Sequence, residues 1–152
     1  MDSFYEMPGH IIRRLHQIST AIFAEECAEF DLTPVQYAAL EAIEANPDVD
    51  ATRLSSLIAF DRSTIGDVLE RLETKGWILR APSPTDRRVK LVRLTRDGAR
   101  LLHEVEPAVR RVQDRLLAPL APRDRATVLR LLTQLASHHN DVTSAPQRSI
   151  HD

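Results

Sequence analysis

Two short helices joined by a tight turn are predicted by the stretch LSSLIAFDRSTI, residues 54–65. The first helix is expected over residues 51–58. The second opens at Asp61 or Arg62, and its apolar residues recur at the three- and four-residue spacing of one helical face. We expect it to end at Gly76, because glycine tolerates the left-handed conformation that closes many helices. Two such helices in succession form a helix-turn-helix.

A β-hairpin is predicted directly after this motif. Two segments contain enough apolar and β-branched residues to form strands, namely residues 77–80 (WILR) and 89–94 (VKLVRL). The connection APSPTDRR, residues 81–88, is too long for a tight turn and is rich in proline and arginine. A basic hairpin that follows a helix-turn-helix is a wing.

Helices are also predicted on both sides of this unit. One runs from Pro8 to Phe30, and a second begins at the capping box formed by Thr33 and Gln36. Thr95 caps a long helix that Pro107 should bend, and a last helix follows Pro122. Their apolar stripes exceed what a small winged helix can cover, so these helices pack on one another in a monomeric bundle or on a second subunit. We expect a homodimer, because a helix-turn-helix that reads a palindrome needs two-fold symmetry. The predicted divisions are an N-terminal dimerisation helix (1–32), a DNA-binding domain (33–100), C-terminal dimerisation helices (101–139) and a flexible tail (140–152).

Composition restricts the functional class. The 152 residues are 43% hydrophobic and 28% charged, which is typical of one globular domain. No apolar run is long enough for a membrane span, and the start MDSFYE does not resemble a signal peptide, so we expect a cytoplasmic protein without a membrane partner. The single cysteine, Cys27, is interpreted as a packing residue. Catalytic, metal-binding and nucleotide-binding motifs are not found, so we predict no enzyme activity, no metal and no cofactor.

Charge is distributed unevenly along the chain. The net charge is −2, but residues 80–100 carry seven basic residues and two acidic residues, a local charge of +5. A basic segment on a mildly acidic chain indicates a surface for a polyanion, although a solvated charged face gives the same count. Its position in the predicted wing favours double-stranded DNA.

The combined pattern resembles the MarR family. The resemblance covers about residues 33–100 and rests on four motifs in order, namely residues 54–65, LETKGW (72–77), DRR (86–88) and LTRDG (94–98). It implies a mainly α fold, a winged helix-turn-helix with flanking dimerisation helices. It also implies a homodimeric transcription regulator, usually a repressor that a small, often aromatic, ligand releases from its operator.

Seven residues are candidates for DNA binding. The first turn of the second helix of the motif should enter the major groove, and wing arginines suit a narrow minor groove. Asp86, which matches the family's wing motif, is expected to brace the wing by pairing with an arginine. The candidates are Arg62, Ser63, Thr64, Asp67, Arg87, Arg88 and Lys90.

Two positions depart from the family pattern. Ala59 stands in the turn where glycine is common, and Gly66-Asp67 replaces a polar or basic pair in the recognition helix. Asp67 could accept a hydrogen bond from a cytosine N4 amine.

An effector site is predicted near the junction of the first helix and the winged helix. His10 and Arg14 lie one turn apart on the first helix, His16 lies on a neighbouring face, and Tyr37 belongs to the next helix. Arginine can bind a carboxylate with two hydrogen bonds, and histidine or tyrosine suits a ring hydroxyl or nitrogen. Alternatively, His10 and Arg14 pair with acidic residues or with the partner subunit.

The sequence therefore predicts a repressor that binds a palindromic operator and is released by an aromatic carboxylic acid. Short motifs resemble those of regulators of aromatic-acid breakdown. This resemblance makes 6-hydroxynicotinate the best candidate effector of the present protein. One alternative is a ligand-independent DNA-binding regulator. Another is a protein-interaction module that has kept the fold but lost DNA binding.

Overall fold

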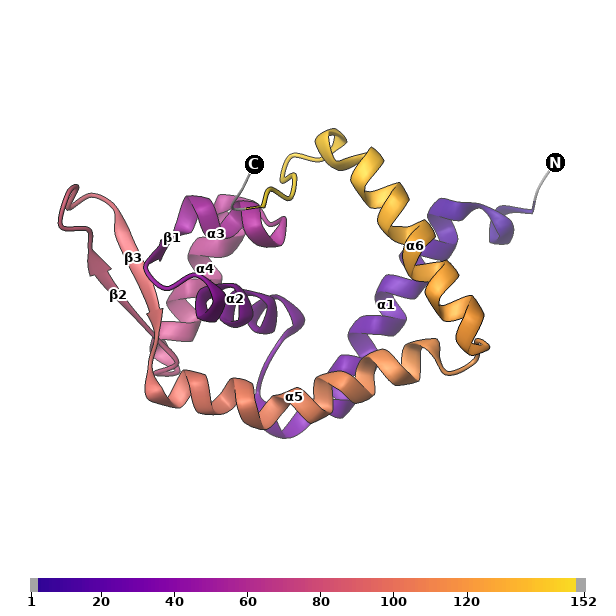
Figure 1. Cartoon of the computed structure of the whole chain (residues 1–152), viewed down its shortest axis with the longest axis horizontal. Helices are drawn as coiled ribbons and strands as arrows, with labels where there is room; N and C mark the ends of the chain where they lie inside the picture. The colour runs from indigo at the N-terminus through magenta and orange to yellow at the C-terminus, as the bar shows by residue number, and fades with distance from the viewer. Residues whose placement is uncertain (1–2, 150–152) are drawn as a thin grey trace.

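The computed structural model describes residues 3–149, and these form six α-helices, three short 3-10 turns and one small sheet. Figure 1 shows the winged-helix elements at one end of the molecule, α1 and α6 at the other, and α5 running between them. The helices are α1 (Pro8–Glu26), α2 (Pro34–Ala45), α3 (Ala51–Ile58), α4 (Arg62–Thr74), α5 (Arg96–Leu117) and α6 (Pro122–His138). The strands are β1 (Val49–Asp50), β2 (Ile78–Pro82) and β3 (Lys90–Leu94), in the sheet order β1-β3-β2.

This architecture confirms the predicted fold, with small differences at the element ends. Helix α1 stops at Glu26, and a separate 3-10 turn over Ala28–Phe30 leads to Asp31 in the left-handed conformation. The chain must change direction there so that it can enter the capping box of α2. Strands β2 and β3 each begin one residue later than predicted, and β2 continues through Pro82. Residues 1–2 and 150–152, which belong to the predicted N-terminal segment and tail, lie outside the described residues.

Side-chain caps explain where the helices begin. Thr33, Asp50, Asp61 and Thr95 each accept a hydrogen bond from the backbone N–H three residues later. These bonds satisfy N–H groups that have no partner within the helix. The predicted helix starts are therefore determined by local chemistry.

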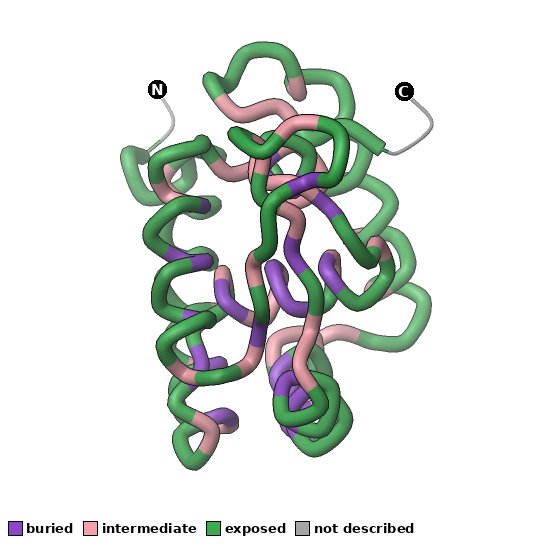
Figure 2. The backbone as a smooth tube through the Cα atoms, turned by 90° about the vertical axis from the view of Figure 1, so that its left-hand side faces the viewer, coloured by how far each residue is buried: buried purple, intermediate pink, exposed green. Residues whose placement is uncertain are grey.

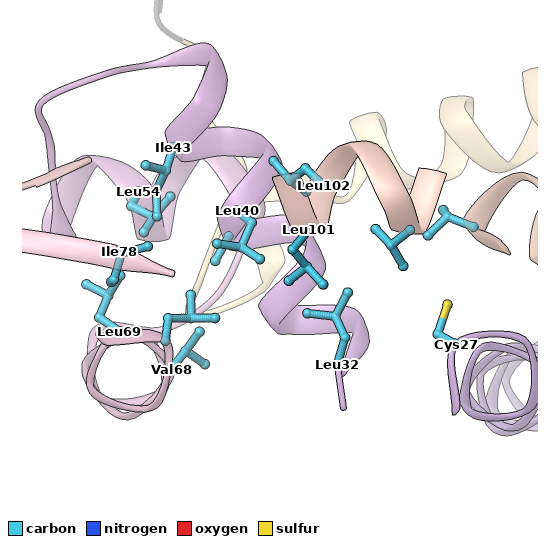
Figure 3. Close-up of a cluster of buried hydrophobic side chains, with 14 of the residues drawn as sticks. Cys27, Leu32, Leu40, Ile43, Leu54, Val68, Leu69, Ile78, Leu101 and Leu102 are labelled. Carbon is cyan, nitrogen blue, oxygen red and sulfur yellow. The ribbon is translucent and has the colours of Figure 1, made fainter. Parts of the chain in front are cut away.

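One continuous hydrophobic core joins the winged helix to α5 and to the end of α1. Figure 3 shows it running from Leu69 and Ile78 through Leu40 to Leu101 of α5, and onward to Cys27, which directly follows α1. Figure 2 shows buried positions on the inward sides of the elements and exposed positions on their outer turns. Cys27 is only 2% exposed, and burial raises the pKa of its thiol, with the Glu26 charge adding to the effect. It is the packing residue that we expected.

Helix α5 is attached firmly to the base of the wing. The Thr95 backbone N–H donates to the Trp77 carbonyl over 3.0 Å, and the Thr95 hydroxyl donates to the Gly76 carbonyl over 2.6 Å. Gly98 is buried against the same segment, and a Cβ there would lie 2.1 Å from the Trp77 carbonyl oxygen. Only glycine allows α5 to approach the chain this closely.

Ion pairs attach α1 to the far half of α5. Glu26 accepts from Arg111 over 2.9 Å and from Arg115 over 3.0 Å, and Glu25 accepts from Arg115 over 2.9 Å. The Arg111 hydrogen bond, followed by the Arg115 bond, lowers the pKa of Glu26. Helix α5 continues through Pro107 without a break and follows a curved path in Figure 1.

The apolar faces of α1 and α6 are uncovered. Helix α6 has no buried residue, and the first half of α1 carries a row of exposed apolar side chains. The exposed large apolar residues on α1, on α6 and in the turn before α1 are Phe4, Tyr5, Met7, Ile11, Ile12, Leu15, Ile18, Leu129, Leu131, Leu132 and Leu135. No helix in residues 3–149 has the length and apolar character needed to cross a membrane.

The segment after α6 returns to the helix-turn-helix, as Figure 1 shows. Asn140 holds Gln147 by two hydrogen bonds, one in each direction, of 2.8 and 2.9 Å. Arg148 pairs with Asp141, and the Arg148 backbone N–H donates to the Ser56 carbonyl of α3 over 2.8 Å. The predicted tail therefore has a defined course up to Ser149, while its flexibility stays a prediction.

Candidate DNA-binding surface and effector site

The first turn of α4 is organised by the carboxylate of Asp61. It accepts from the Thr64 backbone N–H over 2.8 Å, from the Ser63 hydroxyl over 2.8 Å and from the Thr64 hydroxyl over 2.9 Å. These bonds, the Thr64 N–H first among them, lower the pKa of Asp61. Both hydroxyl protons point to Asp61, so Ser63 and Thr64 present acceptor lone pairs to an incoming ligand. The carboxylate also occupies the place that a phosphate would take at this helix end.

The outer face of α4 contains few positive charges. Ile65, Val68, Leu69 and Leu72 are buried against the core. The exposed side of the helix carries two cations and three carboxylates, of which Glu73 is paired with Arg80. Its exposed residues are Arg62, Ser63, Gly66, Asp67, Glu70, Arg71, Glu73 and Thr74.

The wing carries a paired and an unpaired arginine next to each other. Asp86 accepts from the Arg88 backbone N–H over 3.1 Å and from its guanidinium over 3.2 and 3.3 Å. The expected pairing of Asp86 with an arginine is therefore present. The Arg88 side chain is still 92% exposed. The side chains of Arg87 and Lys90 are exposed, and neither side chain forms a hydrogen bond or ion pair within residues 3–149. The Lys90 charge acts on Glu73, where it helps to lower the carboxyl pKa.

Several basic residues of the segment 80–100 have acidic partners. Glu73 and Asp48 come from outside the segment, and counting them lowers its charge from +5 to +3. The sequence count overstated the positive charge, because both partners lie outside the counted segment. The pairs are Arg80–Glu73, Arg88–Asp86, Arg93–Asp48 and Arg100–Asp97.

These pairs also hold the wing in place. Arg80 of β2 donates to Glu73 of α4 over 3.1 and 3.2 Å, which joins the wing to the recognition helix. Arg93 of β3 binds Asp48, next to β1. Sequence reasoning did not predict Glu73 and Asp48 as partners of wing arginines, and no local pattern in the sequence points to these pairs.

Comparison with known proteins identifies the family. Residues 32–90 match the model of the MarR family. The HTH-type transcriptional repressor NicR of Pseudomonas putida is 32% identical over 130 residues, which cover 86% of this chain and 82% of that protein. The chain belongs to the MarR family. It is a winged-helix, DNA-binding transcriptional regulator and not an enzyme.

Solved MarR-type structures are closely similar to the whole chain. PcaV of Streptomyces coelicolor, in complex with its natural ligand, has a TM-score of 0.84 and 32% identity, covering 90% of this chain and 96% of that one. Bordetella bronchiseptica BpsR, whose DNA binding is regulated by 6-hydroxynicotinic acid, has a TM-score of 0.84 and 29% identity, covering 90% and 97%. The repressor CouR, bound to a 23-mer DNA duplex, has a TM-score of 0.82 and 28% identity, covering 90% and 98%.

The predicted effector residues are not gathered in one cavity of this MarR chain. His10 packs against Phe4 and Tyr5, with ring centroids 4.5 and 5.8 Å apart, and its Nδ1 lies 3.1 Å from the guanidinium of Arg13. Arg14 and His16 are exposed on α1.

Tyr37 lies deeper in the molecule, against the end of α1. Its ring centroid is 6.3 Å from that of Phe23. Burial, followed by its contact with Glu41, raises the pKa of Tyr37. Within one chain, Tyr37 is therefore separated from His10, which lies thirteen residues before Phe23 on the same helix.

Tyr37 opens onto a groove of about 450 Å³ between α2 and α5. Its polar lining is mainly acidic, from Glu41, Glu44 and Glu106, with His103 as a further polar group. The cation of Arg110 is already paired with Glu106. By itself, this groove does not favour an organic anion, because its carboxylates would repel one.

Proposed function

We propose that this MarR protein is a homodimeric repressor that binds a pseudo-palindromic operator and is released by a small aromatic carboxylic acid. The best candidate effector is 6-hydroxynicotinate. The observation that carries the proposal is the combination of a complete winged helix with two uncovered apolar helix faces at the other end of the same rigid core. The similarity to NicR, BpsR and PcaV supports the choice of effector.

The homodimer is supported by the apolar side chains of α1 and α6. Exposed apolar patches of this extent are typical of interfaces, and burial against a second copy would supply the missing core. The two-fold axis would place the recognition helices about 34 Å apart, one turn of DNA.

Analytical ultracentrifugation tests the dimer directly. We expect Leu132→Glu on α6 to yield monomers and to weaken operator binding. Leu79→Glu is the matched control for the oligomeric state, because Leu79 is also an exposed leucine but lies on the wing strand β2. A monomeric wild-type protein at micromolar concentration would contradict the proposal.

In the proposed complex, Arg62, Ser63, Thr64 and Asp67 face the major groove. Arg87, Arg88 and Lys90 belong to the wing and contact the adjacent backbone and minor groove. The exposure of the wing cations supports this arrangement. Arg87→Ala should weaken binding by roughly tenfold, as expected for a lost charged contact worth about 1–3 kcal/mol.

The proposed effector site is completed only in the dimer. Arg14 anchors the carboxylate, and His10, His16 and Tyr37 bind the ring substituents. Support comes from the separation of Tyr37 from the other three in a single chain, which a second copy of α1 could bridge.

Fluorescence anisotropy of a labelled fragment of the gene's own upstream region tests both parts. We expect tight, salt-sensitive binding that 6-hydroxynicotinate weakens, with salicylate and hydroxybenzoates as comparison acids. Arg14→Ala should remove the response to the acid while DNA binding persists. Arg123→Ala, at an exposed position in the first turn of α6, is the control and should keep the response. A response that persists in Arg14→Ala would show that the anchor is wrongly assigned.

A ligand-independent DNA-binding regulator is the second candidate. It is favoured by the acidic groove at Tyr37 and by the existing partner of His10. A thermal-shift assay distinguishes the two, since a ligand that binds only the folded state must raise the melting temperature. No shift with any of the acids would favour this second candidate.

A further inference from the structure

The four glycines of the chain differ in what requires them. Gly76 has a positive φ of 77°, and Gly98 has no room for a Cβ. Gly9 and Gly66 have neither reason, because a Cβ at either position would meet nothing within 4 Å. Gly9 lies in the first turn of α1, whereas Gly66 lies in the middle of α4 and is exposed. A glycine inside a helix lowers the folding equilibrium constant roughly two- to fivefold relative to alanine. Nothing within the described chain compensates for this loss.

Gly66 leaves a gap on the outer face of the recognition helix. Arg62 lies one turn before it and Glu70 one turn after it, on the same side. Asp67 follows directly and is also exposed. The backbone of α4 is therefore most accessible at Gly66, directly beside the short acidic side chain of Asp67.

The chemistry of this face favours hydrogen-bond donors. Ser63 has committed its hydroxyl proton to Asp61, and Asp67 carries a carboxylate, so both present acceptors. A DNA phosphate next to Asp67 would be repelled by its carboxylate. In the major groove, the matching groups are the exocyclic amines, of which the cytosine N4 amine is the partner for a carboxylate.

We propose that Gly66 and Asp67 together read one base step of the operator. The missing side chain of Gly66 lets the helix backbone approach the base edges closely. That approach brings the short Asp67 side chain within hydrogen-bonding distance of a cytosine amine. The inference rests on the proposed operator binding. It makes Gly66, which has no side chain, one of the positions that determine which DNA sequence the protein recognises.

The test compares stability with DNA affinity in the full-length protein. Gly66→Ala should raise the folding equilibrium constant two- to fivefold in urea denaturation, because alanine favours the helix. It should weaken binding to the upstream fragment about tenfold or more, and leave binding to a mixed-sequence duplex within about twofold. A merely structural role would move stability and affinity in the same direction.

Two further variants sharpen the result. Gly66→Ala combined with Asp67→Glu should recover part of the lost affinity, because the longer side chain spans the added distance. Thr74→Ala is the matched control, since Thr74 is exposed on the last turn of the same helix. It should leave the affinity for the upstream fragment unchanged.

Several outcomes would overturn the inference. Unchanged operator affinity in Gly66→Ala overturns it while the proposed function stands. Equal losses on the upstream fragment and the mixed-sequence duplex overturn it as well, because they indicate a clash with the DNA backbone. If the wild-type protein binds neither DNA, the proposed function fails and the inference fails with it.

Discussion

At the scale of single residues, Ala59 has a backbone conformation that glycine adopts more easily than alanine. It caps α3 with φ 57° and ψ 46°, the left-handed conformation in which a Cβ is strained. The turn of the helix-turn-helix needs this conformation to bring α4 back across α3. Glycine would adopt it without strain.

We therefore expect Ala59→Gly to stabilise the protein. Relief of the left-handed strain, about 1–2 kcal/mol, exceeds the extra entropy that glycine gives the unfolded chain, about 0.4–1 kcal/mol. Urea denaturation should show a higher midpoint with an unchanged slope. Ala99→Gly, at an exposed helical position of α5, should do the opposite. A lower midpoint for Ala59→Gly would show that the turn is not strained.

Acid sensitivity also belongs to particular residues. The Arg93 hydrogen bond lowers the pKa of Asp48, and the Arg88 hydrogen bond lowers the pKa of Asp86. Because these carboxyls are more acidic in the folded state, their contribution to stability is present above the unfolded pKa. It is lost as the pH falls through the folded pKa.

Between pH 7 and about pH 5, these groups should therefore not change the melting temperature. At pH values below about 4, the melting temperature should decrease. Asp48→Asn should lower the melting temperature at pH 7 and make the decrease in acid smaller. If the variant and the wild type lose the same number of degrees between pH 5 and pH 3, the Asp48–Arg93 pair does not contribute.

At the scale of elements, local signals predicted most of the fold. Capping residues such as Thr33 and Thr95, and the glycine after α4, mark helix ends through contacts within a few residues. Strand β1 was missed because two residues, Val49–Asp50, are too few to show a period. It exists only because Val49 pairs with Val92, which lies far along the chain.

The candidate site was less predictable than the fold for the same reason. The sequence shows that Arg62 or Arg87 is basic, but not that Arg80 is already bound to Glu73. It placed His10 and Tyr37 in one candidate site by their position near the helix junction, whereas the structure separates them within the chain. Long-range pairing and the contribution of a second subunit do not leave a periodic pattern in one sequence.

The attachment of α5 to the wing gives a prediction at this scale. Gly98→Ala would place a Cβ 2.1 Å from the Trp77 carbonyl oxygen, so α5 must move away from the wing base. We expect a loss of about 1–3 kcal/mol of stability, the usual cost of overpacking. The change should be visible as a lower melting temperature and a shifted Trp77 fluorescence. A variant as stable as the wild type would show that α5 can shift freely.

At the scale of the whole molecule, the distribution of charge controls how the protein responds to salt. The predicted DNA-contacting cations that form no ion pair in the described part of the chain are Arg62, Arg87 and Lys90, three in each chain. Each phosphate that a cation neutralises adds about −0.9 to the slope of log affinity against log salt. The paired arginines of the segment 80–100 should add little.

For a dimer, we therefore expect a slope of roughly −5. The slope would be more than twice as steep if every basic residue of the wing segment reached a phosphate. Anisotropy titrations at four or five salt concentrations measure it. Arg87→Ala should reduce the magnitude by roughly 2 per dimer, whereas Arg93→Ala should leave it nearly unchanged. Equal reductions in the two variants would contradict this division of charge.

The return of the chain to α3 after α6 has a practical consequence for handling the protein. Ser149 lies in a groove with Thr52 and Ser56 of α3, so a bulky group attached at Ser149 would lie beside the helix-turn-helix. A group attached at Phe4 would lie next to the uncovered apolar face of α1. The turn between α5 and α6 offers a third position. Because Cys27 is buried and is the single cysteine, a new cysteine at Pro119 would take a thiol-reactive dye selectively, away from both surfaces.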